Sequence, residues 1–306
     1  METVVRSMRY DVAIVGGGPA GLSAALLLGR CRRSVLVLDD GRYRNAASGH
    51  VHGFITRDGT PPAELRSLAR REIAGYPSVC FRDQRVVDAR ATDGVFELVC
   101  ADSTVVRARR MLLATGLVDK LPEVPGAEAL LGERLFHCPY CDGWERREQP
   151  LGAYASGDDR GARFALEMSL WSRDVVFFTD GPYALEPRYH DRLREHGIRI
   201  QDQQITRFEG SGDGLDIVFS DGTRSHRRAL FFSVGCQQRS DLADKLGCRM
   251  TKKGGVESGG LEATSVPGLW VAGDASRDAL QAIVGAGEGS KAALAINTSL
   301  LEEDLW

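Results

Sequence analysis

The first clear pattern along the chain is a short apolar run, Tyr10–Val15, followed by a glycine-rich turn and a mostly apolar segment, Leu22–Leu28. The run is rich in β-branched residues, which predicts a buried strand, and the second segment has the composition of a helix. Glycines occupy positions 16, 17, 18 and 21 between them. The pattern therefore predicts a strand, a glycine turn and a helix.

The spacing of these glycines is that of a dinucleotide-binding turn. Gly16 permits a tight turn, Gly18 lets the backbone approach a pyrophosphate, and Gly21 lets the helix pack closely on the strand. The next predicted strand, Ser34–Leu38, ends in two aspartates about 20 residues further on, where a carboxylate can bind ribose hydroxyls. We expect a dinucleotide here, the alternative being a tight turn without a ligand.

Two later segments indicate that the dinucleotide is FAD. Met111–Gly116 is a predicted buried strand that ends in a turn of small residues, and Pro267–Asp274 repeats this design near the C-terminus. Both resemble flavoprotein signatures. The small and apolar segment Gln281–Ala295 predicts a helix whose dipole would stabilise negative charge on a reduced flavin, although a packed helix at a sheet edge has the same composition.

Two cysteines carry the candidate chemistry. Cys138 and Cys141 are separated by two residues, and Asp142 follows them. Such a pair can close a redox-active disulfide beside an acid that moves protons, provided that a local field favours the thiolate. Half of a zinc site has the same spacing, but the sequence contains no second CxxC to complete one. We therefore predict dithiol/disulfide exchange and no metal.

Four motifs together resemble the low-molecular-weight thioredoxin reductase family of FAD proteins, over nearly the whole chain. They are GGGPAG at 16–21, ATG at 114–116, CPYCDG at 138–143 and AGD at 272–274. The resemblance implies an α/β fold of two dinucleotide-binding, Rossmann-like three-layer domains, the second inserted in the first, and a homodimer. It implies a FAD-binding domain formed by residues 1–117 and 244–306. Residues 118–243 would form a central redox domain with the CxxC and a degenerate NAD(P)-binding fold.

The resemblance also implies roles for individual residues. Cys141 would face the flavin, Cys138 would exchange with the substrate, and Asp142 would be the acid/base group. The residues expected to contact FAD are Gly16, Gly18, Pro19, Ala20, Gly21, Asp39, Asp40, Asn45, His50, Val86, Thr115, Gly116, Gly273, Asp274, Gln281 and Ala282.

The central segment departs from this family at its nucleotide turn. A second strand-turn-helix runs from Leu151 to Met168, but Ala155 replaces its first glycine and Arg160 its third small residue. Asp159 adds negative charge where phosphates should lie, so we expect a poor pyrophosphate site.

The strand that follows this turn also lacks a feature of the NADPH enzymes. It ends near Asp180, where NADPH-specific reductases carry a cluster of arginines, and here only an isolated Arg188 follows. Asp180 could instead hold the ribose of NADH. Binding of NAD(P) is therefore left open.

A chain with a flavin and a dithiol but a poor nicotinamide site needs another electron partner, and oxygen is the simplest. The segments His50–Phe54, Arg57–Pro62 and His137–Cys141 look like the branch of thioredoxin reductase-like dithiol oxidases. These enzymes close disulfides in natural products such as gliotoxin, holomycin and romidepsin, and pass electrons to oxygen or, in some members, to a pyridine nucleotide. We expect a dithiol oxidase of this kind.

Asp142 complicates this expectation, because several such oxidases carry histidine directly after the second cysteine. Asp142, His137 and His50 are therefore all candidates for the proton acceptor. The alternatives to the oxidase are an NAD(P)H-dependent thioredoxin-type reductase and a flavin-bound sensor without turnover. The substrate would be a small-molecule dithiol, such as a natural product, or a thioredoxin-like protein. Phe136, Tyr140 and Trp144 either line a pocket for it or pack in the core.

Bulk properties set limits on partners and location. The 306 residues are enough for two domains, and the formal net charge of −3 gives no reason to expect nucleic acid or an anionic membrane. Five scattered cysteines besides the pair indicate a reducing compartment. Met1–Arg9 lacks the apolar core of a signal peptide, and no apolar run approaches the roughly 20 residues that span a bilayer. We expect a cytoplasmic protein that does not bind membranes.

Alternating apolar positions predict further strands. Val86–Ala89 and Val95–Val99 suit one antiparallel pair, and Gln204–Phe208 and Leu215–Phe219 suit another. Leu121–Gly126, with two prolines and a glycine, is expected to be an irregular connection.

Overall fold

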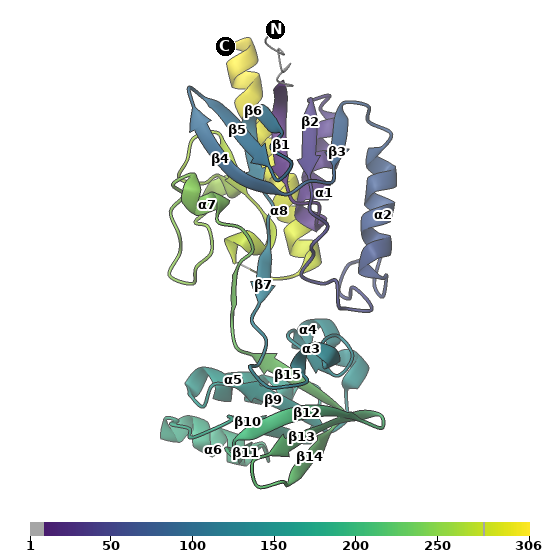
Figure 1. Cartoon of the computed structure of the whole chain (residues 1–306), viewed down its shortest axis with the longest axis vertical. Helices are drawn as coiled ribbons and strands as arrows, with labels where there is room; N and C mark the ends of the chain where they lie inside the picture. Colours follow the sequence, from purple (N-terminus) through teal and green to yellow (C-terminus); the bar gives the residue numbers. More distant parts are fainter. Residues whose placement is uncertain (1–8, 278) are drawn as a thin grey trace. The chain divides into compact units, whose positions relative to one another are not determined.

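A computed structural model describes residues 9–277 and 279–306 (Figure 1). The chain forms two compact units. Unit 1 contains the chain up to Ala46 together with Gly53–Val118 and Gln237–Trp306, and unit 2 contains Ala47–His52 and Asp119–Cys236. Two connecting segments pair with each other as the short strands β7 (Leu117–Asp119) and β16 (Cys236–Gln238). The segment in which no signal peptide was expected lies, except for Arg9, outside the described residues.

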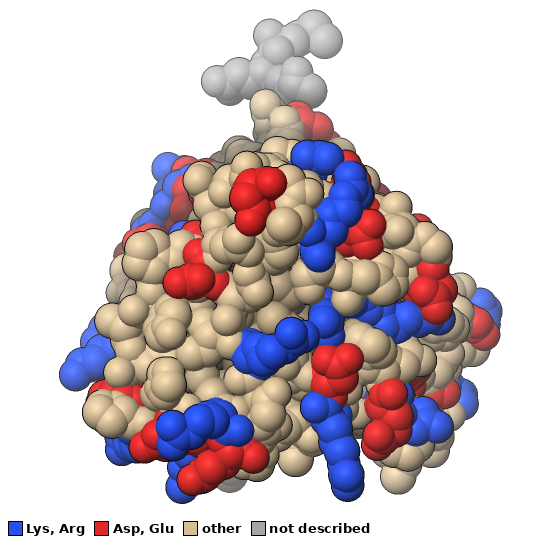
Figure 2. Space-filling model, turned by 90° about the horizontal axis from the view of Figure 1, so that it is seen from below, with Lys and Arg blue, Asp and Glu red and all other residues tan. Residues whose placement is uncertain are grey.

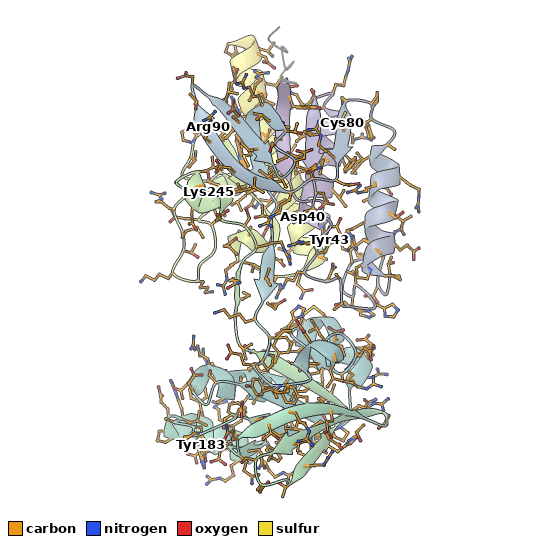
Figure 3. The ribbon with its side chains drawn as sticks, in the orientation of Figure 1. Asp40, Tyr43, Cys80, Arg90, Tyr183 and Lys245 are labelled. Carbon is orange, nitrogen blue, oxygen red and sulfur yellow. A yellow bond between two sulfur atoms is a disulfide. The ribbon has the colours of Figure 1, made fainter. Side chains whose placement is uncertain are left out.

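A mixed seven-stranded sheet forms the centre of unit 1, in the order β3-β2-β1-β6-β5-β4, with β17 also paired to β6. Strands β1, β2, β3, β6 and β17 are parallel, whereas β4, β5 and β6 form an antiparallel meander. The edge strand β3 carries the exposed Cys80 (Figure 3). The strands are β1 (Arg9–Val15), β2 (Val35–Leu38), β3 (Val79–Arg82), β4 (Val86–Thr92), β5 (Val95–Cys100), β6 (Val105–Leu113) and β17 (Leu269–Val271).

The alternation of side chains along β1 divides the core of unit 1 between the two faces of the sheet. Val12 and Ile14 pack in one cluster with α1 (Pro19–Arg30) and α8 (Ala282–Leu305), whereas Ala13 and Val15 pack in a second cluster on the opposite face. The remaining helical segments of unit 1 are α2 (Pro62–Ile73), α7 (Leu242–Lys245), η2 (Gly260–Glu262) and η3 (Gly273–Ser276).

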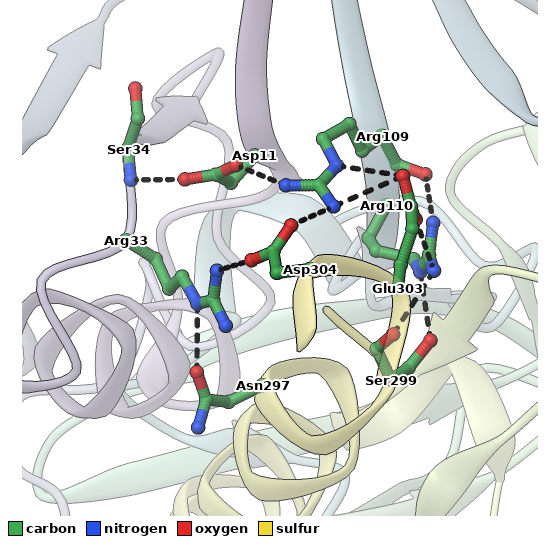
Figure 4. A network of polar contacts seen from close by, with 9 residues as sticks. All are labelled: Asp11, Arg33, Ser34, Arg109, Arg110, Asn297, Ser299, Glu303 and Asp304. Atoms are coloured by element: carbon green, nitrogen blue, oxygen red, sulfur yellow. Dashed lines mark hydrogen bonds and ion pairs between the residues drawn. The ribbon is translucent and has the colours of Figure 1, made fainter. Parts of the chain in front are cut away.

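Helix α8 continues to Leu305, well beyond the expected end near Ala295. Arginines in the middle of β6 and after α1 bind its last turns (Figure 4): Arg109 pairs with Glu303 and Asp304, and Arg33 pairs with Asp304. Arg109 also binds Asp11 on β1 at 3.0 Å. These ion pairs join residues far apart in sequence, which explains why composition alone did not predict the additional turns.

Unit 2 is built on a five-stranded parallel sheet in the order β11-β10-β9-β15-β8. Helices α5 (Asp159–Met168) and α6 (Pro187–Glu195) pack on one face, and an antiparallel meander of β12, β13 and β14 packs on the other. The strands are β8 (Leu135–Phe136), β9 (Leu151–Ala155), β10 (Val175–Phe178), β11 (Arg199–Gln201), β12 (Ile205–Ser211), β13 (Gly214–Phe219), β14 (Arg224–Arg227) and β15 (Ala229–Ser233). The short helices are α3 (Ala127–Leu130), α4 (Pro139–Asp142) and η1 (Trp144–Arg146).

Both units thus have the helix, sheet and meander layers of a dinucleotide-binding fold, which confirms the expected α/β fold class. The two predicted antiparallel pairs form as β4 with β5 and β12 with β13. The residues of Leu121–Gly126 belong to neither a helix nor a strand.

The charged side chains are distributed without a dominant sign on the face that Figure 2 shows, where basic and acidic groups are interspersed. This agrees with the small formal net charge of −3. Among the described residues, no helix is both long enough and apolar enough to cross a bilayer.

Candidate functional site

The glycine turn between β1 and α1 is shaped for close approach of a ligand to the backbone. Gly16 has a φ of +113°, and a side chain at Gly21 would lie 1.9 Å from the carbonyl oxygen of Gly16. At Gly18, by contrast, an added Cβ would meet no protein atom within 4 Å. Gly18 is also the N-cap of α1 and provides no side chain to cap it. Open space therefore lies beside the positive end of the helix, where phosphates bind.

The two aspartates after β2 have different surroundings. Asp39 is only 4% exposed, and its Oδ2 accepts hydrogen bonds from the hydroxyl of Tyr43 at 2.5 Å and from Arg70 at 2.9 Å. Asp40 is exposed, and its carboxylate accepts a hydrogen bond from the backbone N–H of Arg42 (Figure 3). Asp39 is therefore the carboxylate held next to the glycine turn. A Cβ atom added at Gly17 would lie only 2.2 Å from its Oδ2 atom.

Some of the groups that surround Asp39 come from α2, which the sequence patterns did not predict. Burial, together with the hydrogen bond to Asp39, raises the pKa of Tyr43 to about 12. The guanidinium of Arg66 lies 3.7 Å from the centre of the Tyr43 ring. Arg66 and Arg70 are one helical turn apart, and this i, i+4 spacing on an amphipathic segment was the sequence signal that could have found them.

The C-terminal segments approach the same turn. An added Cβ at Gly289 would lie 2.0 Å from the carbonyl oxygen of Ala20, and one at Gly273 would lie 3.0 Å from the Ala20 side chain. Helix α8 begins after Gln281, and the Gln281 side chain does not cap the first N–H groups of the helix. The fold therefore brings the N-termini of α1 and α8 to one region of unit 1.

The other residues expected to contact FAD are distributed as follows. Asp274 forms an ion pair with Arg44 at 3.0 Å, and Asn45 accepts a hydrogen bond from Arg66 at 3.4 Å. Pro19 and Ala282 are the first residues of α1 and α8. Val86 begins β4, and Thr115 and Gly116 follow β6. All of these residues lie in unit 1, whereas His50 lies in unit 2.

These residues of unit 1 fit a dinucleotide such as FAD. The glycine turn leaves space beside an uncapped helix N-terminus. The Oδ1 atom of the buried Asp39 accepts only a long hydrogen bond, at 3.3 Å from the Gly41 N–H, so it retains the capacity to accept a hydrogen bond from a ribose hydroxyl. The distribution of charge and space is therefore that of a pyrophosphate and ribose site.

The cysteine pair lies in unit 2, directly after β8. Cys138 and Cys141 form a disulfide, and the backbone N–H of Cys141 donates to the sulfur of Cys138 at 3.1 Å. Pro139 is the first residue of α4, a position at which proline suits a helix. Because an N–H group points at Cys138, negative charge on this sulfur is stabilised when the disulfide opens.

Asp142 ends α4 and is the most strongly perturbed carboxyl group beside the disulfide. Burial raises its pKa to about 6 from the ordinary value of 3.8, and the positive charge of Arg146 opposes this effect. Glu145 raises the pKa further, whereas His52 and His50 lower it. Asp142 can therefore both take up and release a proton near neutral pH.

Three histidines lie near the redox pair in unit 2. His52 Nε2 is 3.5 Å from the carboxylate of Glu145, and the His50 and His52 ring centres are 5.9 Å apart. His137 Nε2 is 3.7 Å from the carboxylate of Asp119. His50 lies in the unit that carries the disulfide, and its contact with FAD stays a prediction. The contact between Glu145 and His52 was not foreseen.

The aromatic residues around the pair divide into core and surface. Phe136 is buried in the core of unit 2, whereas Tyr140 and Trp144 are 66% and 65% exposed. The Tyr140 ring packs edge-on against Trp171, with 5.5 Å between ring centres. Tyr140 and Trp144 are thus the members of the expected set that remain available to a ligand in unit 2.

The second nucleotide turn is filled by groups of the protein itself. Asp158 caps α5, and its Oδ1 accepts hydrogen bonds at 3.0 Å from the backbone N–H groups of both Arg160 and Gly161. Asp180 accepts hydrogen bonds from the Tyr154 hydroxyl at 3.0 Å and from the Ile205 N–H at 2.6 Å.

Space and positive charge at this turn are limited as well. An added Cβ at Gly157 would lie 2.7 Å from Tyr183 (Figure 3), and Arg188 is paired with Glu186 at 2.8 Å. The carboxylate of Asp159 accepts a hydrogen bond from the backbone N–H of Glu186 at 2.9 Å. Across the described ranges, no three His, Cys, Asp or Glu side chains are grouped so that they could hold a metal ion.

Comparison with known proteins identifies relatives along most of the chain. The family model described as pyridine nucleotide-disulphide oxidoreductase matches residues 10–289. A probable thioredoxin reductase of Arthroderma benhamiae is 31% identical, over 96% of this chain and 81% of the relative. Thioredoxin reductase tcpT of Claviceps purpurea is 33% identical, over 86% of each chain. The crystal structure of HlmI has a TM-score of 0.91 and 35% identity, and the match covers 97% of this chain and 94% of that one.

The thioredoxin reductase-type members of the matched family bind FAD and use NADPH. The glycine turn, Asp39 and the disulfide of this chain fit that type. The chain therefore belongs to the pyridine nucleotide-disulphide oxidoreductase family, as an FAD-binding oxidoreductase of the thioredoxin reductase type.

Proposed function

We propose that the protein oxidises a small-molecule dithiol to an intramolecular disulfide through Cys138 and Cys141, with oxygen as the final electron acceptor. In this proposal unit 1 binds FAD and unit 2 carries the redox pair. The observation that supports the oxidase most strongly is the second nucleotide turn, where Asp158 occupies the backbone N–H groups that would otherwise bind a pyrophosphate. A reduced-nicotinamide donor would have to compete with that carboxylate and with its negative charge.

Asp180 supports the same proposal. Its two oxygens accept hydrogen bonds from the Tyr154 hydroxyl and the Ile205 N–H, and burial together with Asp180 raises the pKa of Tyr154. Tyr154 therefore stays protonated and keeps donating to Asp180. A carboxylate bound in this way is less able to take the two hydroxyls of a ribose.

The exchange reaction follows from the positions of the two sulfurs. One substrate thiolate attacks the sulfur of Cys138, which forms a mixed disulfide and releases Cys141 as a thiolate. The second substrate thiolate then attacks the substrate sulfur of that mixed disulfide, which closes the substrate disulfide and releases Cys138. The N–H of Cys141 stabilises Cys138 as this leaving group. Two electrons pass from the substrate to the cysteine pair, and the two thiol protons are lost.

Asp142 is suited to accept one of these protons. With a pKa of about 6 it is mostly ionised at neutral pH, yet it is basic enough to be protonated during turnover. His137 beside Asp119 and His50 beside His52 remain candidates for the second proton. The chemistry that FAD supplies when bound is two-electron acceptance from the reduced pair and transfer to oxygen, which yields hydrogen peroxide.

The exposed rings of Tyr140 and Trp144 support a substrate with apolar surface. A thioredoxin-like protein is the alternative substrate, and an NAD(P)H-dependent reductase is the alternative function. The alternative function is favoured by the acidic residue Asp142 and by the names of the relatives from Arthroderma benhamiae and Claviceps purpurea.

An anaerobic flavin titration separates the two functions. We expect a dithiol to bleach the flavin in equimolar amounts while NADPH and NADH barely change its spectrum. In air, the dithiol should be oxidised over many turnovers with consumption of oxygen. Rapid stoichiometric reduction by either nicotinamide would instead establish the reductase.

Variants of the cysteines test the route of the electrons. Cys141→Ser should abolish dithiol turnover while FAD remains bound, because the residues that fit FAD lie in unit 1. Cys80→Ser, at an exposed cysteine of unit 1, is the matched control and should retain full activity. Retained turnover in Cys141→Ser would contradict the proposed mechanism.

A further inference from the structure

The arginine that ends η1 packs against residues on both sides of the cysteine pair. Arg146 donates a hydrogen bond from Nη1 to the backbone carbonyl of Asp142 at 3.1 Å. Its guanidinium carbon also lies 3.8 Å from the centre of the Phe136 ring. Phe136 ends β8 two residues before Cys138, and Asp142 directly follows Cys141. One side chain therefore bridges the two ends of the segment that carries the disulfide.

These two contacts fix both the guanidinium and the end of α4. Phe136 is only 3% exposed, so its ring gives the guanidinium a fixed surface in the core of unit 2. Asp142 is the last residue of α4, and the carbonyls at the end of a helix lack partners within the helix. A guanidinium that binds such a carbonyl satisfies it. Arg146 thus holds in place the residue whose side chain is suited to accept a thiol proton.

The charge of Arg146 also acts on the side chain of Asp142. Besides burial, the groups that act on this carboxyl are Arg146 and Glu145 from η1, and His52 and His50 from the segment 47–52 of unit 2. Burial raises the pKa of Asp142 to about 6, and Arg146 opposes this rise more strongly than either histidine does. A guanidinium keeps its charge throughout the working pH range, whereas an imidazole loses its charge near neutral pH. Arg146 is therefore a constant positive charge beside Asp142.

The neighbouring Arg147 makes the same kinds of contact in a different place. Its Nη1 donates to the carbonyl of Trp144 at 2.8 Å, and its guanidinium carbon lies 4.1 Å from the centre of the Trp144 ring. Arg147 and Trp144 are both exposed, whereas Arg146 is half-buried. Arg147 is also not among the charges that act most strongly on Asp142. It therefore provides a matched control for Arg146.

We propose that Arg146 is a positioning residue for dithiol exchange, which fixes the end of α4 and keeps the Asp142 side chain as a carboxylate beside the cysteine pair. This inference rests on the proposed function, because it concerns the proton that the substrate thiol releases. Asp142 takes up that proton when the substrate thiolate forms. The positive charge of Arg146 then favours release of the proton to solvent before the next turnover.

The pH profile of dithiol oxidation tests this role. Oxygen consumption by the flavin-loaded protein with dithiothreitol, measured between pH 5 and pH 8, should show an acidic limb of kcat with a midpoint of about 6, where Asp142 ionises. Arg146→Gln should raise this midpoint by about one pH unit, because it removes an opposite charge near the carboxylate. The kcat should then fall about fivefold at pH 6 and change little at pH 8. Arg146→Lys keeps the charge and should restore the midpoint, and Arg147→Gln should not move it.

A titration without substrate separates this inference from the proposed function. Infrared spectra of the flavin-loaded, disulfide-bonded protein follow ionisation of the Asp142 carboxyl, with Asp142→Asn as the blank. Arg146→Gln should raise this midpoint by about one pH unit, whereas Arg146→Lys and Arg147→Gln should not. Absence of turnover in the unmodified protein would remove the proposed function, and with it the role in exchange, while an infrared shift would still establish the action of Arg146 on Asp142.

Two results overturn the inference itself. One is an infrared midpoint that Arg146→Gln leaves unchanged. The other is a shifted infrared midpoint together with an unchanged acidic limb of kcat, because Arg146 would then act on Asp142 without affecting the exchange reaction.

Discussion

Replacement of Asp142 by asparagine should make the protein more stable but less active, and the gain in stability should depend on pH. Burial raises the pKa of Asp142 from 3.8 to about 6 in the folded protein. Between these values the folded state binds a proton that the unfolded state has already released, so stability falls as pH rises from about 4 to about 6. Above pH 6 Asp142 is ionised in both states, and the folded state bears the full free-energy cost of the buried charge.

The magnitude of the effect follows from the difference of about 2 between the pKa values of Asp142 in the folded and unfolded states. Each unit corresponds to about 1.4 kcal/mol, which gives a cost of about 3 kcal/mol at pH 7 to 8. An asparagine side chain carries no charge at any pH and avoids this cost. The substitution Asp142→Asn should therefore raise the unfolding midpoint by roughly 6 °C at pH 8 and leave it almost unchanged at pH 4.

Thermal unfolding of the flavin-loaded, disulfide-bonded protein between pH 4 and pH 8 measures this effect. Asp202→Asn, at an exposed carboxyl of unit 2, is the control and should show no comparable gain. In parallel, Asp142→Asn should lower dithiol oxidation at pH 7 by about a hundredfold, since it removes the proton acceptor. A stability difference that is the same at pH 4 and pH 8 would refute the buried-charge argument, and full activity would refute the catalytic role.

Three further outcomes follow from unit 1. Gly18→Val should fold normally, because an added Cβ meets no protein atom within 4 Å, but should purify with little FAD, as flavin absorbance will show. Asp39→Asn should weaken FAD binding by about tenfold or more and lower the pKa of Tyr43 from about 12, which a phenolate absorbance titration against the unmodified protein can detect. Arg109→Gln should destabilise unit 1 by about 1–3 kcal/mol in denaturant unfolding, because it breaks contacts to β1 and α8, whereas Arg30→Gln, at the exposed end of α1, should have little effect.

The unit to which His50 and His52 belong could not be read from their place in the sequence. His50 lies between β2 and α2 in the sequence, and both of these elements belong to unit 1. In the structure, Ala47–His52 belongs to unit 2 and brings His52 to Glu145 near the disulfide. A short segment that leaves one unit and packs in the other carries no periodic signal in the sequence.

Local patterns were sufficient where the chemistry is local. The glycine spacing required positive φ and close packing within a few residues, and the CxxC spacing allowed a disulfide within one helical turn, so the sequence by itself determined the fold class, the dinucleotide turn and the redox pair. These features depend on residues that are neighbours along the chain.

Tertiary structure decided the features that depend on burial and on distant partners. The burial of Asp142, the ion pair of Asp39 with Arg70 and the hydrogen bond from Tyr154 to Asp180 all depend on segments far apart in sequence. The electrostatic state of a carboxylate or a guanidinium is set by its solvent exposure and by the charges around it in space. Neither quantity is encoded in the order of neighbouring residues, so these states became visible only when the chain was folded.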